Sequence, residues 1–246
     1  MTVTSQARAV IIGGGVVGCS IAYHLGKLGW RDVVLLERKQ LTCGTTWHAA
    51  GLIAQLRATQ NMTRLAKYSQ ELYFGLEAET GVATGFKRNG SITVALSDER
   101  MEELRRSAAM ARAFGVEIDE VSPTDIAARY PGLSVADVVG GVWLPKDGQA
   151  DPVNITQALA KGARTFGVKI HQGVKVTGIT QANGRVTGVT TDAGNITADY
   201  VVNAGGMWAR DIGQMAGVAV PLHACEHFYI VTEAMPALTA NLPVLR

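Results

Sequence analysis

The sequence has few cysteines, almost no net charge and no long apolar run, and each absence excludes a class of protein. Cys19, Cys43 and Cys225 form no CxxC pair, which argues against a disulfide framework and favours a reducing compartment, so we expect a cytoplasmic protein. A formal charge of +2 argues against nucleic acid or an anionic membrane as partner. The longest apolar run, near residues 9–19, is interrupted by glycines and too short to span a bilayer, and the first eight residues lack the apolar stretch of a secretory signal.

A metal site is not expected either. His223 and His227 have the spacing HxxxH with Cys225 between them, which on a helix would let both histidines reach one ion. Residues 228–232, however, have the composition of a strand, and residues four apart in a strand are separated by about 13 Å. No HExxH motif is present.

The chain begins instead with a nucleotide-binding pattern. An apolar run at residues 9–12 leads into Gly13, Gly15 and Gly18 with the spacing GxGxxG, and a second apolar run at 33–36 ends at Glu37. This is the dinucleotide-binding βαβ fingerprint, in which the glycines allow a tight turn, close approach to a pyrophosphate and close helix packing. The acidic residue accepts hydrogen bonds from ribose and disfavours a 2′-phosphate, but Arg38 weakens that argument. The pattern alone does not separate FAD from NAD.

The rest of the chain alternates between helical and strand patterns. Residues 59–80 predict an amphipathic helix with an apolar stripe at Met62, Leu65, Leu72 and Leu76. A strand is expected at 91–96, a helix capped by Asp98 up to residue 114, strands at 116–121 and 138–144, and between them a short helix opened by residues 122–125. After a helix near 153–166, strands at 174–182 and 185–190 flank the hairpin dipeptide at 183–184, and strands at 196–198 and 200–204 complete a β meander.

These elements predict an α/β protein with a split Rossmann-like domain. We expect residues 1–84 and 145–222 to form a discontinuous FAD-binding domain that contains the meander. Residues 85–144 and 223–246 would form an incomplete α+β domain on the substrate side, an assignment made by analogy between folds.

Several further strings resemble one family. They are GGGVVG at 13–18, ER at 37–38, LTxGTTWHAAGL at 41–52, DG at 147–148 with DP at 151–152, VNAGxxWA at 202–209, and HxY at 227–229 with VT at 231–232, where x is any residue. Together they resemble the FAD-dependent amine oxidoreductases of the D-amino-acid-oxidase superfamily, and within it the dimethylglycine dehydrogenase and sarcosine dehydrogenase family. General flavoproteins share the first string but not the one at 41–52, which is the most specific.

The resemblance implies a flavin site and assigns its residues. It implies that His48 carries the flavin covalently and that Glu37 and Arg38 lie at the adenosine end, with the backbone of Val176 at the adenine. The pyrophosphate turn would be Gly13, Gly15, Val16, Val17 and Gly18. The segment along the cofactor would be Gly44, Thr45, Thr46, Trp47, His48, Ala49, Ala50, Gly51 and Leu52, and Asn203, Ala204, Gly205 and Trp208 would close over it. A His48 that merely packs beside Trp47 is the alternative.

The resemblance also implies a reaction and its partners. The substrate would be an N-methylated amine such as dimethylglycine or sarcosine, oxidised by hydride transfer to the flavin, with electrons passing to an electron-transfer flavoprotein or similar acceptor. Tetrahydrofolate would take part only in a full-length form. His227 and Tyr229 are candidates for positioning the amine in catalysis, and an interior His–Tyr pair on a strand is the alternative interpretation.

The pattern departs from the family at residue 246, where family members continue with further substrate strands, a glycine-rich loop and a folate-binding region. We therefore expect a truncated chain that turns over weakly or not at all alone. A non-catalytic FAD-binding fragment, or a subunit completed by a second chain, is the alternative from another class. A glycine or D-amino-acid oxidase is the alternative enzyme, against which the TWH string argues.

Overall fold

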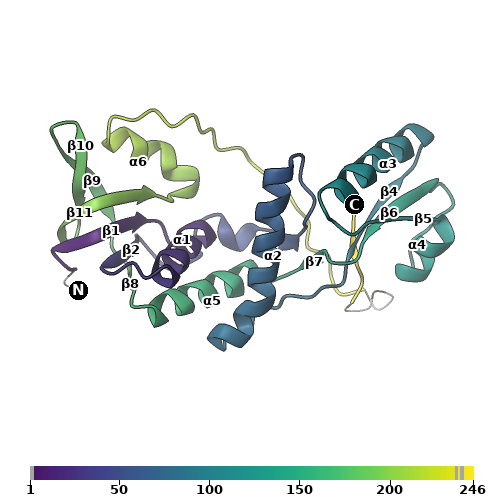
Figure 1. Cartoon of the computed structure of the whole chain (residues 1–246), viewed down its shortest axis with the longest axis horizontal. Coiled ribbons are helices and arrows are strands. Elements are labelled where there is room, and N and C mark those ends of the chain that lie inside the picture. The colour runs from purple at the N-terminus through teal and green to yellow at the C-terminus, as the bar shows by residue number, and fades with distance from the viewer. Residues whose placement is uncertain (1–2, 236–237, 239–240) are drawn as a thin grey trace. The chain divides into compact units, whose positions relative to one another are not determined.

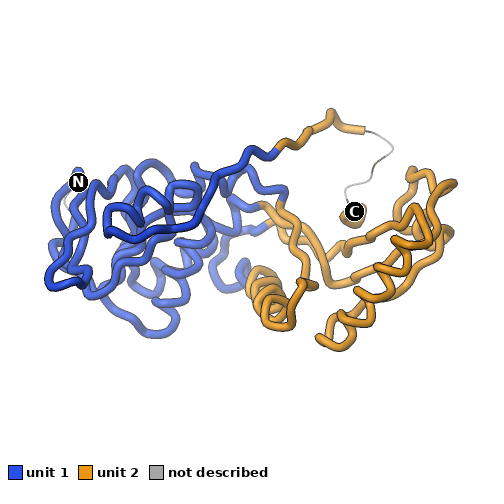
Figure 2. Tube along the Cα trace, turned by 90° about the horizontal axis from the view of Figure 1, so that it is seen from above, with its two compact units in different colours: residues 1–50, 76–84, 152–227 blue, residues 51–75, 85–151, 228–246 orange. Residues whose placement is uncertain are grey.

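The computed structural model describes residues 3–235, 238 and 241–246, and its contacts divide the chain into two compact units (Figure 1; Figure 2). Unit 1 comprises Met1–Ala50, Leu76–Thr84 and Pro152–His227. Unit 2 comprises Gly51–Gly75, Gly85–Asp151 and Phe228–Arg246. This division differs from the expected domains at three places. Residues 51–75 and 145–151, expected in the FAD-binding domain, belong to unit 2, and residues 223–227, expected on the substrate side, belong to unit 1.

Unit 1 is built on a six-stranded sheet in the order β8-β2-β1-β11-β10-β9. The first four strands of this order pair in parallel, and the last two continue the sheet as an antiparallel meander. This is the mixed sheet expected of a Rossmann-like domain with a meander. The strands are β1 (Gln6–Ile12), β2 (Val33–Glu37), β8 (Lys169–Gln172), β9 (Val176–Ala182), β10 (Arg185–Thr191) and β11 (Gly194–Asn203).

Helices cover both faces of this sheet. On one face α1 (Val16–Lys27) packs against α5 (Pro152–Thr165), and on the other lies α6 (Ala209–Met215) (Figure 1). Val10, Ile12 and Leu36 point into the same buried cluster as Ile212 of α6, whereas Tyr23 of α1 lies against Gly162 of α5. Burial on both faces explains the nearly continuous apolar runs in β1 and β2, whereas the edge strand β8 is only partly buried and has polar residues at both ends.

The hairpin between β9 and β10 has the predicted turn. Asn183 and Gly184 have φ angles of 51° and 73°. Positive φ at both central residues is the signature of a type I′ turn, which matches the right-handed twist of the flanking strands. The last two expected strands merge into the single strand β11.

Unit 2 contains a four-stranded sheet in the order β12-β4-β6-β5. Along β6, Val142 and Leu144 pack with α3, and Trp143 packs with the cluster that contains Ile126 of α4, so the two helices cover opposite faces. The elements are β4 (Ser91–Ala95), α3 (Asp98–Ala113), β5 (Asp119–Val121), α4 (Pro123–Arg129), β6 (Gly140–Leu144) and β12 (Val244–Leu245).

The helix starts of unit 2 follow from local side-chain chemistry. The expected cap of α3, Asp98, is wrong by one residue: Ser97 has the extended backbone of a cap, and its Oγ accepts from the N–H of Arg100 at 3.2 Å. Ser122 and Asp125 form a capping box at α4.

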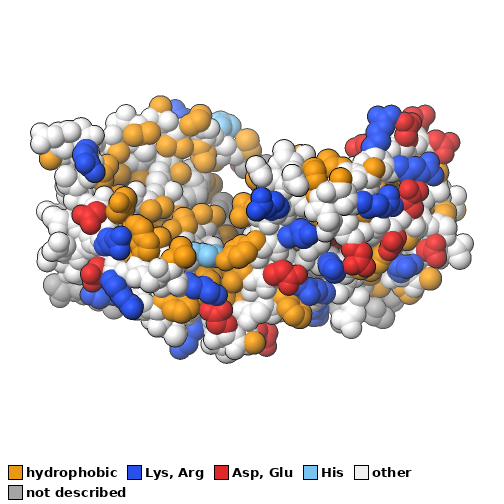
Figure 3. Space-filling view, viewed as in Figure 1, with side chains coloured by type: hydrophobic (Ala, Val, Ile, Leu, Met, Phe, Trp, Pro, Cys, Tyr) orange, Lys and Arg blue, Asp and Glu red, His pale blue; other side chains and the backbone are white. Residues whose placement is uncertain are grey.

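Charges of both signs occupy the outer surface of unit 2. Arg105 forms an ion pair with Glu120, and Figure 3 shows both signs mingled on the visible face of this unit.

The expected apolar stripe of the long helix α2 (Gln60–Thr80) is wrong in the first half of the helix, whereas Leu72 in the second half is partly buried. Met62 and Leu65 are more than half exposed, whereas Thr63 and Gln70 are completely buried. Polar side chains face inward because they satisfy irregular backbone nearby: the Thr63 hydroxyl exchanges hydrogen bonds with the backbone of Arg57, and the Gln70 amide donates to the carbonyl of Lys146. Leu76 is buried as expected.

The strand expected at 228–232 is not formed. Residues 219–235 have no regular secondary structure, and Phe228 and Ile230 are each 88% exposed. The composition favours a strand, but among the described residues none pairs with this backbone. The distance argument against a metal between His223 and His227 therefore does not apply. In the described ranges no three His, Cys, Asp or Glu side chains are grouped as metal ligands.

A buried carboxylate organises the centre of unit 2. Asp147 is 1% exposed; its Oδ1 accepts from the N–H of Gln55 at 2.9 Å and its Oδ2 from the Ser91 hydroxyl at 2.7 Å. Beside it β3 (Leu52–Ile53) pairs with β7 (Gly148–Gln149).

Within the described ranges, no helix is both long and apolar enough to cross a membrane.

Candidate functional site

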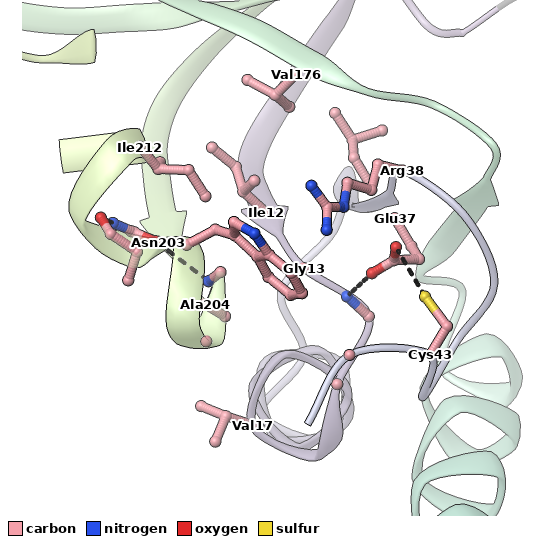
Figure 4. A pocket seen from close by; sticks show the side chains of 18 of the residues that line it. Ile12, Gly13, Val17, Glu37, Arg38, Cys43, Val176, Asn203, Ala204 and Ile212 are labelled. Carbon is pink, nitrogen blue, oxygen red and sulfur yellow. Dashed lines mark hydrogen bonds between the residues drawn. The ribbon is translucent and has the colours of Figure 1, made fainter. Parts of the chain in front are cut away.

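Unit 1 contains a pocket of about 570 Å³ where the strand order of the parallel sheet reverses (Figure 4). In open α/β sheets, ligands bind at such switch points, outside the carboxyl ends of the strands. The pocket lies beyond the carboxyl ends of β1, β2 and β11. It is lined by residues 12–17, 36–38, 43–46, 174–176 and 203–206, and by Trp208, Ala209, Asp211, Ile212 and Met215.

The turn between β1 and α1 forms the floor of the pocket, and its glycines are required by close backbone approach. Gly13 has a φ of 114°, and a Cβ there would overlap the carbonyl oxygen of Ala204. A Cβ on Gly18 would overlap the carbonyl oxygen of Gly13. The turn delivers the N-terminus of α1, whose first N–H groups have no acceptor within the helix, to the pocket. The N–H of Val16 donates to Oγ1 of Thr46 at 3.1 Å.

Two neighbouring side chains at the end of β2 face the pocket with opposite charges (Figure 4). Glu37 is only 8% exposed, and its Oε2 accepts from the N–H of Gly14 at 2.8 Å. The guanidinium of Arg38 stacks on the ring of Trp208, with 3.9 Å between its carbon and the ring centroid. The same indole lies against Gly44, where a Cβ would come within 3.3 Å of the ring.

The segment after β11 forms the opposite wall. The Asn203 side chain holds this segment in shape, because its Nδ2 donates to the carbonyl of Ala209 at 2.8 Å and its Oδ1 accepts from the N–H of Gly205 at 3.1 Å. The fixed turn brings Ala204 against Gly13 and presents Trp208 to Arg38.

Cys19 lies behind the turn and has a packing role. It is fully buried, and its Sγ lies 3.7 Å from the carbonyl oxygen of Gly14. Burial raises the pKa of its thiol to about 12. The side chain therefore stays protonated and unreactive near neutral pH.

The structure gathers many of the residues proposed for the cofactor, but not all. Those that line the pocket are Gly13, Gly15, Val16, Val17, Glu37, Arg38, Gly44, Thr45, Thr46, Val176, Asn203, Ala204, Gly205 and Trp208. Gly18 supports the turn from behind. The pocket wall on this segment ends at Thr46.

The remaining candidates lie outside the pocket lining. Trp47 and His48, on the short helix η1 (Thr46–His48), are exposed and stacked, with ring centroids 3.7 Å apart. Ala49 and Ala50 are also exposed, and Gly51 and Leu52 belong to unit 2. His227 is exposed at the end of unit 1 and Tyr229 is exposed in unit 2, so their roles remain predictions.

Sequence reasoning missed several lining residues. Cys43 and Lys175 lie in loops, and Asp211, Ile212 and Met215 belong to α6. The rule that sites form at the carboxyl ends of parallel strands would have drawn attention to the segment after β11 as a whole. No sequence pattern indicated Lys175.

The pocket fits an adenine dinucleotide. Its volume falls within the range of small-molecule sites, roughly 300–1,000 Å³. Ile12, Val176 and Ile212 supply apolar walls, the α1 N-terminus suits a pyrophosphate, and the Glu37 carboxylate suits ribose hydroxyls.

Comparison with known proteins agrees with this geometry. The model of the family described as FAD dependent oxidoreductase, DAO, matches residues 8–245. The chain is 42% identical to the mitochondrial sarcosine dehydrogenase of Homo sapiens and 41% identical to the mitochondrial dimethylglycine dehydrogenase of Rattus norvegicus. It is 39% identical to the mitochondrial pyruvate dehydrogenase phosphatase regulatory subunit of Mus musculus. Each match covers 98% of this chain but only 27–28% of the relative, so the chain spans little more than a quarter of these relatives' length.

Two solved structures share the fold of this chain. The L-proline dehydrogenase from P. horikoshii superposes with a TM-score of 0.84 at 32% identity, over 88% of this chain and 57% of that chain. The glycine oxidase from Bacillus cereus superposes with a TM-score of 0.74 at 29% identity, over 85% of this chain and 57% of that chain.

Proposed function

The chain belongs to the DAO family of FAD-dependent oxidoreductases, and from that premise we propose that its protein oxidises an N-methylated amino acid such as sarcosine or dimethylglycine. One observation carries the proposal: the glycine turn, the buried Glu37 and the α1 N-terminus converge on one pocket in a chain 41–42% identical to two dehydrogenases of such substrates. When bound, FAD would supply the acceptor for the hydride that leaves the amine carbon together with its two electrons.

Different residues of unit 1 would bind different parts of FAD. The α1 N-terminus and the glycine turn would take the pyrophosphate, and Glu37 would take a ribose hydroxyl. Arg38 and Trp208, already stacked on each other, would bound the adenosine end. The protein thereby fixes one end of the cofactor on a rigid sheet.

We further propose that His48 is the covalent attachment point of the flavin. A neutral imidazole nitrogen is a good nucleophile near neutral pH, and His48 is exposed at the end of the segment that leaves the pocket wall at Thr46. Its stacking on Trp47 limits the orientations of the ring.

Intact mass after acid precipitation tests the attachment. The wild-type polypeptide should retain the mass of one FAD, and His48→Ala should lose it on precipitation. His223→Ala, a second exposed histidine of unit 1, is the matched control and should retain the flavin mass. A yellow native protein whose wild-type polypeptide is bare after precipitation would contradict covalency while leaving FAD binding intact.

Substrate, partners and location follow as parts of the same proposal. We propose an electron-transfer flavoprotein or a similar acceptor for the electrons, tetrahydrofolate only in a longer form, and the cytoplasm as location. His227 and Tyr229 are proposed to position the amine. The assay is reduction of an artificial acceptor, with formaldehyde release measured from sarcosine and dimethylglycine. Glycine is the comparison substrate because a glycine oxidase shares the fold, and its oxidation is measured by acceptor reduction alone, since it has no N-methyl group to release as formaldehyde.

A second candidate is a non-catalytic FAD-binding subunit. It is favoured by one finding: a relative 39% identical over 98% of this chain is named a regulatory subunit. Stoichiometric FAD with no formaldehyde and no flavin bleaching by either methylated substrate would favour this candidate. Bleaching by sarcosine or dimethylglycine would exclude it.

A further inference from the structure

The Glu37 carboxylate is engaged by the protein itself, in addition to facing the pocket. Its Oε2 accepts from the N–H of Gly14 at 2.8 Å (Figure 4), and its Oε1 accepts from the N–H of Lys39 at 2.9 Å. The thiol of Cys43 donates a longer bond to Oε1, at 3.8 Å. A carboxylate offers about four lone-pair positions, so room remains for one more donor.

Both polar groups of Gly14 are held by the segment that begins at Glu37. The N–H of Gly14 is bound by Glu37, and the N–H of Thr42 donates to the carbonyl of Gly14 at 3.0 Å. The N–H of Gly13 donates to the carbonyl of Leu36 at 2.9 Å, which extends the β1–β2 pairing into the turn. A Cβ on Gly14 would come within 2.8 Å of the Glu37 Cβ, so the stem of Glu37 also packs directly on the turn.

We propose that Glu37 is a positioning residue that fixes the phosphate turn before any cofactor binds. The proposal rests on dinucleotide binding in this pocket, as proposed above. Glu37 would then affect ligand binding in two ways. It would accept a hydrogen bond from a ribose hydroxyl directly, and it would act indirectly by holding the Gly14 peptide, which orients Gly15 and the start of α1. A charged acceptor makes a hydrogen bond roughly twice as strong as a neutral one, so an amide replaces it poorly.

Ligands with and without ribose hydroxyls separate the two routes. The probes are ADP and 2′,3′-dideoxy-ADP, each titrated calorimetrically into the flavin-free chain. Glu37→Gln is expected to weaken both ligands by at least about tenfold, because one backbone donor loses its charged acceptor in either case. If Glu37→Gln weakens ADP but leaves 2′,3′-dideoxy-ADP unchanged, Glu37 acts on ribose alone and the proposal is overturned.

Glu79→Gln is the matched control. Glu79 also belongs to unit 1 and accepts from the Tyr23 hydroxyl at 2.7 Å and 2.8 Å, but it lies outside the pocket. It should leave both affinities within twofold of wild type. A general loss of stability would weaken both ligands in both variants, so equal losses in Glu37→Gln and Glu79→Gln would also overturn the proposal.

Hydrogen exchange at Gly14 gives a measurement that needs neither ligand nor variant. The Gly14 amide should exchange slowly in the ligand-free wild-type chain, because it is bound to a buried carboxylate. Fast exchange at Gly14 beside slow exchange in β1 overturns the proposal. If the wild-type chain binds neither FAD nor ADP, the proposed function fails, and the exchange result still decides the role of Glu37 in the turn.

Discussion

Both units bury a carboxylate that accepts hydrogen bonds from distant parts of its unit. In unit 1, Glu37 lies at the carboxyl end of a parallel strand, holds the Gly14 N–H and borders the pocket. In unit 2, Asp147 lies after an antiparallel strand and joins Gln55 to Ser91. The two side chains are chemically alike, but their surroundings give them different tasks.

The difference lies in what each carboxylate faces. Glu37 forms part of a cavity wall and keeps capacity for a ligand donor, whereas Asp147 is 1% exposed and is surrounded by protein. Burial raises the pKa of Asp147, against the opposing effect of its bonds to Ser91 and Gln55. A buried carboxylate is thus a candidate binding residue where it borders a cavity, and a scaffold residue where it does not.

The largest effect is expected for Gly18→Ala in unit 1. The added Cβ would overlap the carbonyl oxygen of Gly13, and because that atom belongs to the backbone of the turn it has little room to move. We expect FAD affinity to fall more than about 100-fold and unit 1 to lose about 3 kcal/mol or more. Flavin titration and thermal unfolding measure both. Gly75→Ala is the control: its Cβ would meet nothing, so helix propensity should raise stability by up to about 1 kcal/mol.

Asp147→Ala should damage unit 2 and spare the pocket. The N–H of Gln55 and the Ser91 hydroxyl would each lose an acceptor, with an expected loss of about 2–4 kcal/mol from unit 2. Hydrogen exchange resolved by segment should show faster exchange in β4 and β6, with FAD affinity within twofold of wild type. A loss of FAD affinity as large as that of Gly18→Ala would erase the contrast between the two carboxylates.

The pH dependence of stability should also carry the signature of Asp147. Because burial raises its pKa above the ordinary value of 3.8, the folded state binds this proton more tightly than the unfolded state. Its contribution to stability is complete below pH 3.8 and is lost as the pH rises through the raised pKa. Relative to Asp147→Asn, the wild-type free energy of unfolding should therefore increase between pH 7 and about pH 4. If the wild-type free energy of unfolding instead decreased on acidification relative to that of Asp147→Asn, the pKa of Asp147 would be lowered in the folded state and not raised.

The smallest effect is expected for Ser97→Ala at the start of α3. Loss of the bond from the Arg100 N–H to the serine Oγ should lower the stability of unit 2 by about 1 kcal/mol. Flavin content should not change. Chemical denaturation followed by α3 helicity provides the measurement, and Asp98→Ala, which removes no cap, should cost less. If Asp98→Ala lowered the stability of unit 2 more than Ser97→Ala does, Asp98 would be the cap, as the sequence predicted.

The sequence predicted unit 1 better than unit 2, for physical reasons. In unit 1, apolar runs marked β1 and β2, the glycine spacing marked the turn, and the pair at 183–184 marked a hairpin whose backbone requires positive φ. The edge strand β8 was not predicted, because its four residues contain no apolar run. In unit 2, Thr63 and Gln70 are buried because irregular backbone needs their hydrogen bonds, and no periodicity reveals that need. The role of Asp147 was hidden similarly, because a DG pair in a sequence indicates a turn whether or not it is buried.

In the candidate site, too, the sequence did not reveal residues whose position depends on the tertiary structure. Residues adjacent to the glycine turn and strand ends were found from the motif, but Lys175, Ile212 and Met215 enter the pocket only because the sheet order places their elements there. Composition at 228–232 predicted a strand, yet a strand needs a neighbour, and none of the described residues supplies one.

Titration of the flavin-free chain with FAD tests the central claim most directly. We expect the chain to take up one FAD, measured by the flavin absorbance, and ADP to compete with it. Gly18→Ala should bind FAD more than about 100-fold more weakly. A wild-type chain whose circular dichroism shows it to be folded, and which takes up no FAD, would contradict the assignment of the unit 1 pocket and the oxidoreductase function built on it.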